Sequence, residues 1–86
     1  MTKAEIRANF EVALDRAVTL GDSPSSIAGF HYKVEGALFD LAFQYPNTTK
    51  AAIDKARKLF EQQMDGTLAR EQAASAEATL RARGYA

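Results

Sequence analysis

The sequence predicts an all-α fold: a small antiparallel helical bundle of three strong helices and a weaker C-terminal helix around a long central helix. Apolar residues recur at spacings of three and four along most of the chain, which is the period of an amphipathic α-helix. Proline and glycine mark the ends of these segments, and no alternating strand pattern competes with them. A chain of 86 residues is the size of a single domain.

The first helix is predicted over residues 3–20. Thr2 and Glu5 have the spacing of a capping box, in which two side chains satisfy the free backbone N–H groups at a helix start. Gly21 suits the left-handed conformation that ends many helices. One face of this helix is apolar and consists of Ile6, Phe10, Ala13, Leu14 and Ala17.

The central helix is predicted over residues 24–45. Pro24 suits the first helical position, and Pro46 disfavours helical geometry in the residue before it. This segment is apolar on two opposite faces, which predicts that neighbours cover it on both sides. The first face holds Ile27, Phe30, Val34, Leu38, Leu41 and Tyr45, and the second holds Tyr32, Gly36, Phe39 and Phe43.

Two further helices are predicted over residues 49–65 and 68–83. The third helix has a bulky apolar face made of Ala52, Ile53, Ala56, Leu59, Phe60 and Met64. The fourth has only a narrow face, made of Ala69, Ala73, Ala76 and Leu80. Small side chains remove little apolar area from water, so we expect this helix to dock weakly or to project from the body.

Composition indicates a cytoplasmic protein without a membrane partner. The chain has no cysteine, so it offers no disulfide and no cysteine-ligated metal. Its start lacks the basic and apolar pattern of a secretory signal. Charged residues interrupt the central helix, so no stretch reaches the roughly 18 apolar residues of a membrane span.

The residues predict neither an enzyme nor a cofactor or metal site. His31 and Glu35 lie one helical turn apart and have the chemistry of a general base with an orienting acid. No nucleophile accompanies them, and two ligands are too few for a catalytic zinc site. A surface ion pair explains this pair more simply. The sequence also contains no glycine-rich phosphate loop.

Binding to DNA or RNA is the alternative function that the charges allow. Residues 48–86 carry seven basic and five acidic side chains, a net charge of +2, and the third helix holds the densest basic run: Lys50, Lys55, Arg57 and Lys58. That helix follows a short turn, as in a helix-turn-helix. Asp54 and Glu61 interrupt the basic run, and the whole chain has zero net charge, which argues against nucleic acid.

The second face of the central helix favours a different function. Aromatic residues are enriched in protein interfaces, and an alanine-rich fourth helix has little bulk with which to cover them. We therefore expect a small protein-binding module, an adaptor, inhibitor or regulatory subunit, whose partner is a second copy of itself or a foreign protein. An ordinary bundle that covers both faces is the competing interpretation. The predicted binding residues are Tyr32, Phe39 and Phe43, with Lys50, Arg57 and Lys58 as a charged rim.

Overall fold

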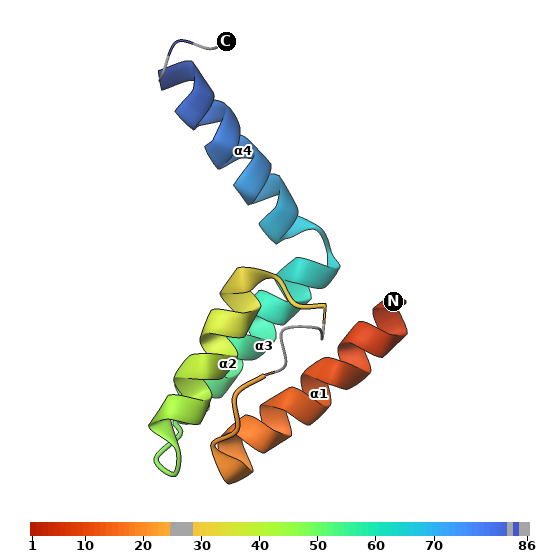
Figure 1. Ribbon diagram of the computed structural model, residues 1–86, viewed down its shortest axis with the longest axis vertical. Coiled ribbons are helices and arrows are strands. Elements are labelled where there is room, and N and C mark those ends of the chain that lie inside the picture. The colour runs from red at the N-terminus through yellow and green to blue at the C-terminus, as the bar shows by residue number, and fades with distance from the viewer. Residues whose placement is uncertain (25–28, 83, 85–86) are drawn as a thin grey trace.

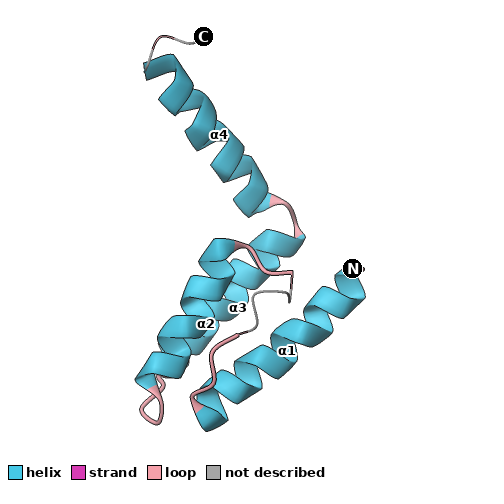
Figure 2. Cartoon of the chain, in the orientation of Figure 1, coloured by secondary structure: helices cyan, strands magenta, loops and turns pink. Residues whose placement is uncertain are grey.

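The computed structural model describes residues 1–24, 29–82 and 84, and it confirms the all-α fold. The helices follow one another as α1 (Lys3–Leu20), α2 (Tyr32–Gln44), α3 (Lys50–Met64) and α4 (Thr67–Ala82) (Figure 1). Within the described ranges no residue forms a strand (Figure 2). The first three helices form the body of the molecule, and α4 extends away from it (Figure 1).

Helix α1 has the bounds that the sequence predicts, because its two caps form. The Thr2 hydroxyl oxygen accepts a hydrogen bond from the Glu5 backbone N–H at 3.1 Å. At the other end Gly21 has a φ of +69° and its N–H donates to the Ala17 carbonyl. A side chain at Gly21 would also come within 3.0 Å of the Tyr45 ring. The backbone at the end of α1 therefore packs closely against Tyr45, the residue that follows α2.

Helix α2 is shorter than predicted, so the expectation of a helix over 24–45 is wrong at its N-terminal end. Pro24 lies in a loop, and residues 25–28, which include Ile27 of the predicted first face, fall outside the described residues. Gly29 has a φ of +84°, a left-handed conformation that interrupts the helical path. The helix begins only after His31, whose ring caps it. Residue Pro46 ends it as expected.

The core lies between α1, α2 and α3 and is centred on aromatic rings. The Phe10 and Phe60 rings stack with their centroids 4.2 Å apart. The ring of Phe30 meets both of them edge-on, at 6.2 and 6.4 Å. From α2 the core receives Val34, Ala37, Leu38 and Leu41. Tyr45, assigned by the sequence to this buried face, instead follows the helix end and is exposed.

Helix α4 projects from the body, which is one of the two arrangements expected from its narrow apolar face. Among the described helices its backbone approaches only α3. Its one buried residue is Leu68, which is 1% exposed, and every residue from Ala69 to Ala82 is exposed. The molecule is therefore elongated, with extents of 48 × 28 × 20 Å.

Candidate protein-binding surface

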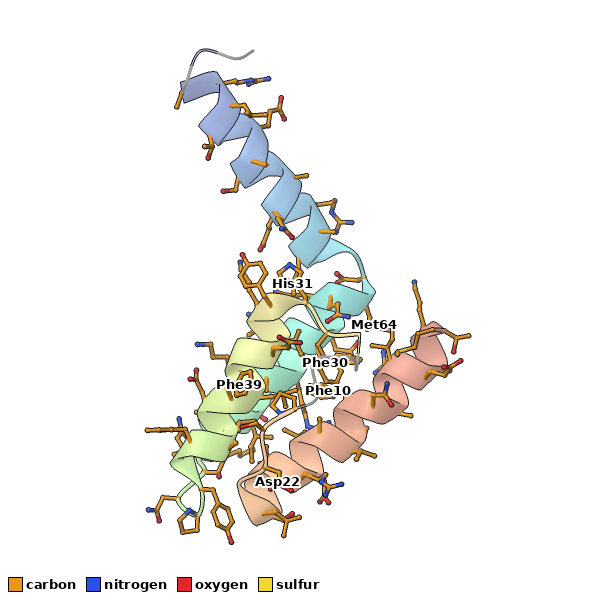
Figure 3. The ribbon with its side chains drawn as sticks, in the orientation of Figure 1. Phe10, Asp22, Phe30, His31, Phe39 and Met64 are labelled. Carbon is orange, nitrogen blue, oxygen red and sulfur yellow. The ribbon has the colours of Figure 1, made fainter. Side chains whose placement is uncertain are left out.

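The outer face of α2 carries three uncovered aromatic side chains. Tyr32 is 61% exposed, Phe39 47% and Phe43 94%. At about 100° per residue, these positions and Gly36 lie about 140–200° around the helix from the buried Val34. They therefore face directly away from the core. We call Tyr32, Gly36, Phe39 and Phe43 the outer face. Figure 3 shows Phe39 on this side of α2, separated from Phe10 and Phe30 in the core.

Gly36 leaves a gap in the middle of the outer face. It is part of the helix, and a Cβ built on it would meet no atom within 4 Å. Bulky rings therefore stand on both sides of a position that has no side chain. Such a surface lets another helix approach closely or accepts a protruding ring.

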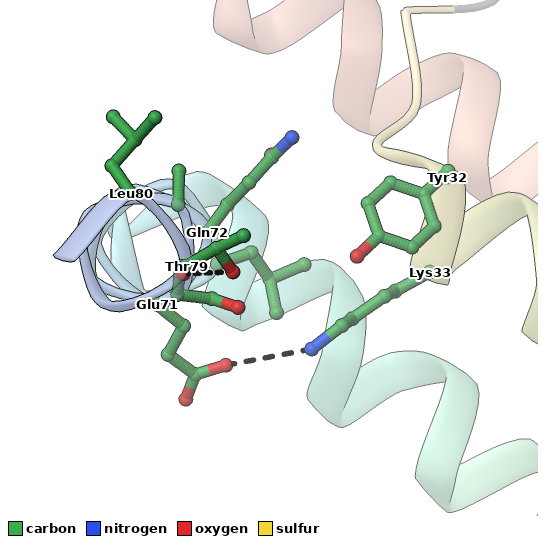
Figure 4. Close-up of a pocket in the computed structure, with 9 residues that line it drawn as sticks. Tyr32, Lys33, Glu71, Gln72, Thr79 and Leu80 are labelled. Carbon is green, nitrogen blue, oxygen red and sulfur yellow. Dashed lines mark hydrogen bonds and ion pairs between the residues drawn. The ribbon is translucent and has the colours of Figure 1, made fainter. Parts of the chain in front are cut away.

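A groove lies at the start of α2, where α4 leaves the body. It has a volume of about 490 Å³ and is lined by Tyr32 and Lys33 on α2 and by Leu68, Glu71, Gln72 and Leu80, among others, on α4 (Figure 4). Lys33 Nζ lies 3.7 Å from Glu71 Oε2 and forms an exposed ion pair across the groove. The groove is continuous with the outer face through Tyr32. Helix α4 thus borders the aromatic surface without covering it.

A second groove lies beside the C-terminal half of the outer face. Phe39 and Phe43 line it together with Asp40, Ala42, Gly21 and Ser23, and its volume is about 340 Å³. Two more exposed apolar side chains lie at this end of the body: Leu20 is the last residue of α1, and Tyr45 directly follows α2. Large exposed apolar groups gathered on one surface are typical of interaction sites rather than of scattered surface residues.

His31 has a structural role that the sequence did not suggest. Its Nδ1 accepts a hydrogen bond from the Lys33 backbone N–H at 3.1 Å, which caps α2. A neutral imidazole then carries its proton on Nε2, which donates to Gln72 Oε1 on α4 at 3.1 Å. The ring also stacks on Tyr32 with centroids 4.5 Å apart. His31 thus connects the outer face to α4, and its ring contacts are with these groups rather than with the Glu35 carboxylate.

The basic residues of α3 do not form one continuous rim. The Arg57 guanidinium is bound to Glu11 on α1, with Nη1 3.0 Å from Oε1, so it is engaged within the body. Lys50 and Lys58 are exposed, and their amino groups make no hydrogen bond or ion pair with a described residue. We therefore keep the aromatic residues as the centre of the surface and leave Arg57 out of it.

Charges at the base of α4 stabilise its junction with α3. The Asp65 carboxylate accepts a hydrogen bond from the Thr67 backbone N–H at 2.8 Å. Hydrogen bonds from the Thr67 side chain and then from its backbone hold the pKa of Asp65 below its ordinary value. On the body, the hydrogen bond from Arg7 to Glu61, 2.7 Å long, lowers the pKa of Glu61. These contacts are exposed and contribute modestly to stability.

Other kinds of site find no support in the part of the chain that the structure describes. No group of three or more His, Asp or Glu side chains there is arranged to hold a metal ion. None of the helices there has both the length and the apolar composition needed to cross a bilayer. Comparison of the chain with protein-family models, curated proteins and solved structures found no match.

The sequence predicted the aromatic residues of this candidate surface, and the structure shows that they are exposed, but the α4 residues beside them were not predicted. Leu68, Gln72 and Leu80 join Tyr32 only because α4 leaves the body next to the start of α2. These residues lie more than thirty positions from Tyr32, so periodicity within one helix says nothing about their meeting. The one local indication was Leu68 itself, a bulky residue before a run of alanines.

Proposed function

We propose that this protein is a small, non-enzymatic, cytoplasmic protein-binding module that docks a partner polypeptide on the outer face of α2. The observation that carries the proposal is the exposure of Tyr32, Phe39 and Phe43 on the side of α2 opposite the core. Aromatic side chains in water gain free energy when a partner covers them, at about 25 cal/mol per Å² of apolar area. An adaptor, an inhibitor or a regulatory subunit would each use such a face.

The surroundings of the face support this proposal. Phe43 is almost completely exposed, although a phenylalanine of a stable monomer is normally buried at least in part. The grooves at the two ends of the face give a partner concave surfaces in addition to a helix ridge. Interfaces with central aromatic residues and a polar border are the usual kind of protein–protein contact.

Binding to DNA or RNA through α3 remains the alternative, and it has weaker support. Lys50 and Lys58 are available for phosphate contacts, but Arg57 is paired with Glu11. A phosphate-binding surface loses affinity steeply as salt rises, whereas an aromatic interface does not. A gel shift with random duplex at increasing salt, with Lys58→Glu as the variant, separates the two functions.

Site-specific photo-cross-linking in cells tests the proposed function. A photoreactive phenylalanine analogue replaces Phe43 in one variant and Val12 in a matched control. Val12 is an exposed apolar residue on α1 that lies outside the outer face. We expect a covalent adduct to a polypeptide at position 43 and none at position 12. Equal adduct formation at both positions, or none at position 43, contradicts the proposal.

A further inference from the structure

We propose that the outer face of α2 binds the outer face of a second copy of this chain, with the two α2 helices antiparallel. This inference rests on the proposed function and names the partner. Its first support is the spacing of the face. Tyr32, Gly36, Phe39 and Phe43 are separated by four, three and four residues, so the pattern is the same read in either direction. Such a face matches itself about a twofold axis.

The antiparallel arrangement fills the gap at Gly36. It places Gly36 of each copy opposite Phe39 of the other, and Tyr32 opposite Phe43. A Cβ added at Gly36 would meet no atom within 4 Å, so the second Phe39 ring approaches the helix where no side chain stands in its way. Because the axis repeats the contact, two rings fill two gaps. A large side chain placed in a hole on a facing helix is the general packing mode of paired helices.

The charges beside the face favour this direction of pairing. Lys33 and Asp40 lie on the same flank of the outer face, directly after Tyr32 and Phe39. In the antiparallel pair Lys33 of each copy comes next to Asp40 of the other, which gives two attractive contacts. A parallel pair would instead bring Glu35 of one copy next to Asp40 of the other, because flanking residues five positions apart then meet. Two carboxylates there would repel each other.

Asp40 is available for such a contact. Its carboxylate makes no hydrogen bond or ion pair with any residue in the described ranges, although it is exposed beside Phe39 and Phe43. The existing partner of Lys33 is Glu71, at a distance of 3.7 Å and with both side chains about half exposed. The Lys33 amino group therefore reaches Asp40 of a second copy without giving up a buried interaction.

The groove beside α4 gives the most exposed ring a place in the pair. Phe43 of the second copy comes next to Tyr32, at the edge of the groove that Leu68 and Leu80 line. Helix α4 projects from the body (Figure 1), and the groove lies between it and the start of α2 (Figure 4). One helix face buries less area than the roughly 1,200–2,000 Å² of a standard interface. We therefore expect a reversible dimer whose population rises with protein concentration.

Charge reversal tests both the dimer and its direction. Molar mass is measured by light scattering over a wide range of concentrations for the unmodified chain, for Lys33→Asp, for Asp40→Lys and for the variant that carries both changes. Each single reversal creates two repulsive contacts, and we expect it to weaken the dimer by about tenfold. The double variant restores attraction and should return to the original dissociation constant.

Two controls exclude indirect effects. Glu71→Gln removes the intramolecular partner of Lys33 and should leave the dimer unchanged. Circular dichroism checks that the helices of each variant remain folded. We expect no loss of helix, because Lys33 and Asp40 are both exposed.

The possible outcomes separate this inference from the proposed function. A monomeric mass at every concentration, together with an adduct of position 43 to a foreign protein, overturns the dimer and leaves the binding function standing. A dimer that both single reversals leave intact, or that the double variant fails to restore, overturns the antiparallel pairing. A monomer that gives no adduct at position 43 contradicts both.

Discussion

Two sets of three aromatic residues lie on opposite sides of α2, and they differ in their exposure to water. Phe10, Phe30 and Phe60 stack and meet edge-on between the helices of the body. Tyr32, Phe39 and Phe43 lie on the outer side and are exposed. Both sets are aromatic, but the inner rings come from α1, the loop before α2 and α3, whereas the outer residues lie at helical spacings on α2 alone. The difference is that α1 and α3 cover the inner side of α2, whereas α4 projects past the outer side.

The inner set contributes to the stability of the fold, and we propose that the outer set serves in binding. Burial of a ring removes apolar area from water within the chain, so the inner set stabilises the folded state. The outer rings remain in contact with water, so in the proposed complex their burial would contribute to binding instead of folding. Substitutions in the two sets should therefore change different measured quantities, as the following predictions state from the largest effect to the smallest.

Phe60→Ala should have the largest effect on folding. The ring is 1% exposed and touches both other inner aromatics, so its removal leaves a cavity. We expect the free energy of unfolding to fall by about 3–5 kcal/mol, measured by urea denaturation followed by circular dichroism. In a small domain this is a large share of the total stability. A loss below 1 kcal/mol would mean that the inner set is not the core.

Leu68→Ala should release α4 from the body. Leu68 is the one residue of α4 that is buried, so its loss removes the main apolar anchor of that helix. We expect a destabilisation of about 2–4 kcal/mol and faster amide hydrogen exchange along α4 than along α1. Leu80→Ala is the matched control, because Leu80 lies on the same helix and is half exposed. If Leu80→Ala releases α4 equally, Leu68 is not the anchor.

Gly36→Ala should stabilise the monomer. Inside a helix, alanine is more favourable than glycine by about 1 kcal/mol of folding free energy. The added methyl group would meet no atom within 4 Å. We expect the free energy of unfolding of a dilute sample to rise by up to that amount. At higher concentration the same methyl group occupies the gap that accepts Phe39 of a second copy, so the dimer should weaken. A dimer that is strengthened instead would argue against the proposed contact at Gly36.

Phe43→Ser should change stability least and binding most. Because the ring is 94% exposed, we expect the free energy of unfolding to change by less than about 0.5 kcal/mol. The dimer, or the adduct with another protein, should nevertheless be lost. Thermal unfolding and light scattering on the same sample measure both effects. A clear drop in stability without loss of association would assign Phe43 to folding.

The junction between α3 and α4 should respond to acid. Hydrogen bonds from Thr67 favour the charged form of Asp65, so its pKa in the folded protein lies below the ordinary value of 3.8. A group with a depressed folded pKa stabilises the folded state above its unfolded pKa, and this contribution is lost as the pH falls through the folded pKa. The Thr67 amide resonance in NMR should titrate with a midpoint below 3.8. In Asp65→Asn that titration should disappear, whereas its persistence would assign it to another group.

Prediction from the sequence succeeded where local chemistry decides the structure. The capping pair at Thr2 and Glu5 and the glycine at position 21 place α1 within the predicted bounds. Pro46 ends α2 as expected. The start of α2 was predicted too early because Pro24 suits the first position of a helix. The left-handed Gly29 and the capping ring of His31 do not change the periodicity of the sequence, so the true start could not be recognised from it. A histidine cap depends on where the ring points, which only the folded chain defines.

By itself, the sequence determined four helical segments, the phenylalanine residues of their apolar faces and a second aromatic face on the second helix, but not where that helix begins. These features follow from periodicity, because helical spacing alone decides which side chains share a face. Only the tertiary structure decided that this second face stays uncovered. Leu68 anchors the first turn of α4 in the core. The alanines farther along α4 provide too little apolar area to hold the rest of this helix against α2, so α4 extends away from the body. Covering a face depends on where another element packs, and that placement is set by contacts between residues far apart in the chain.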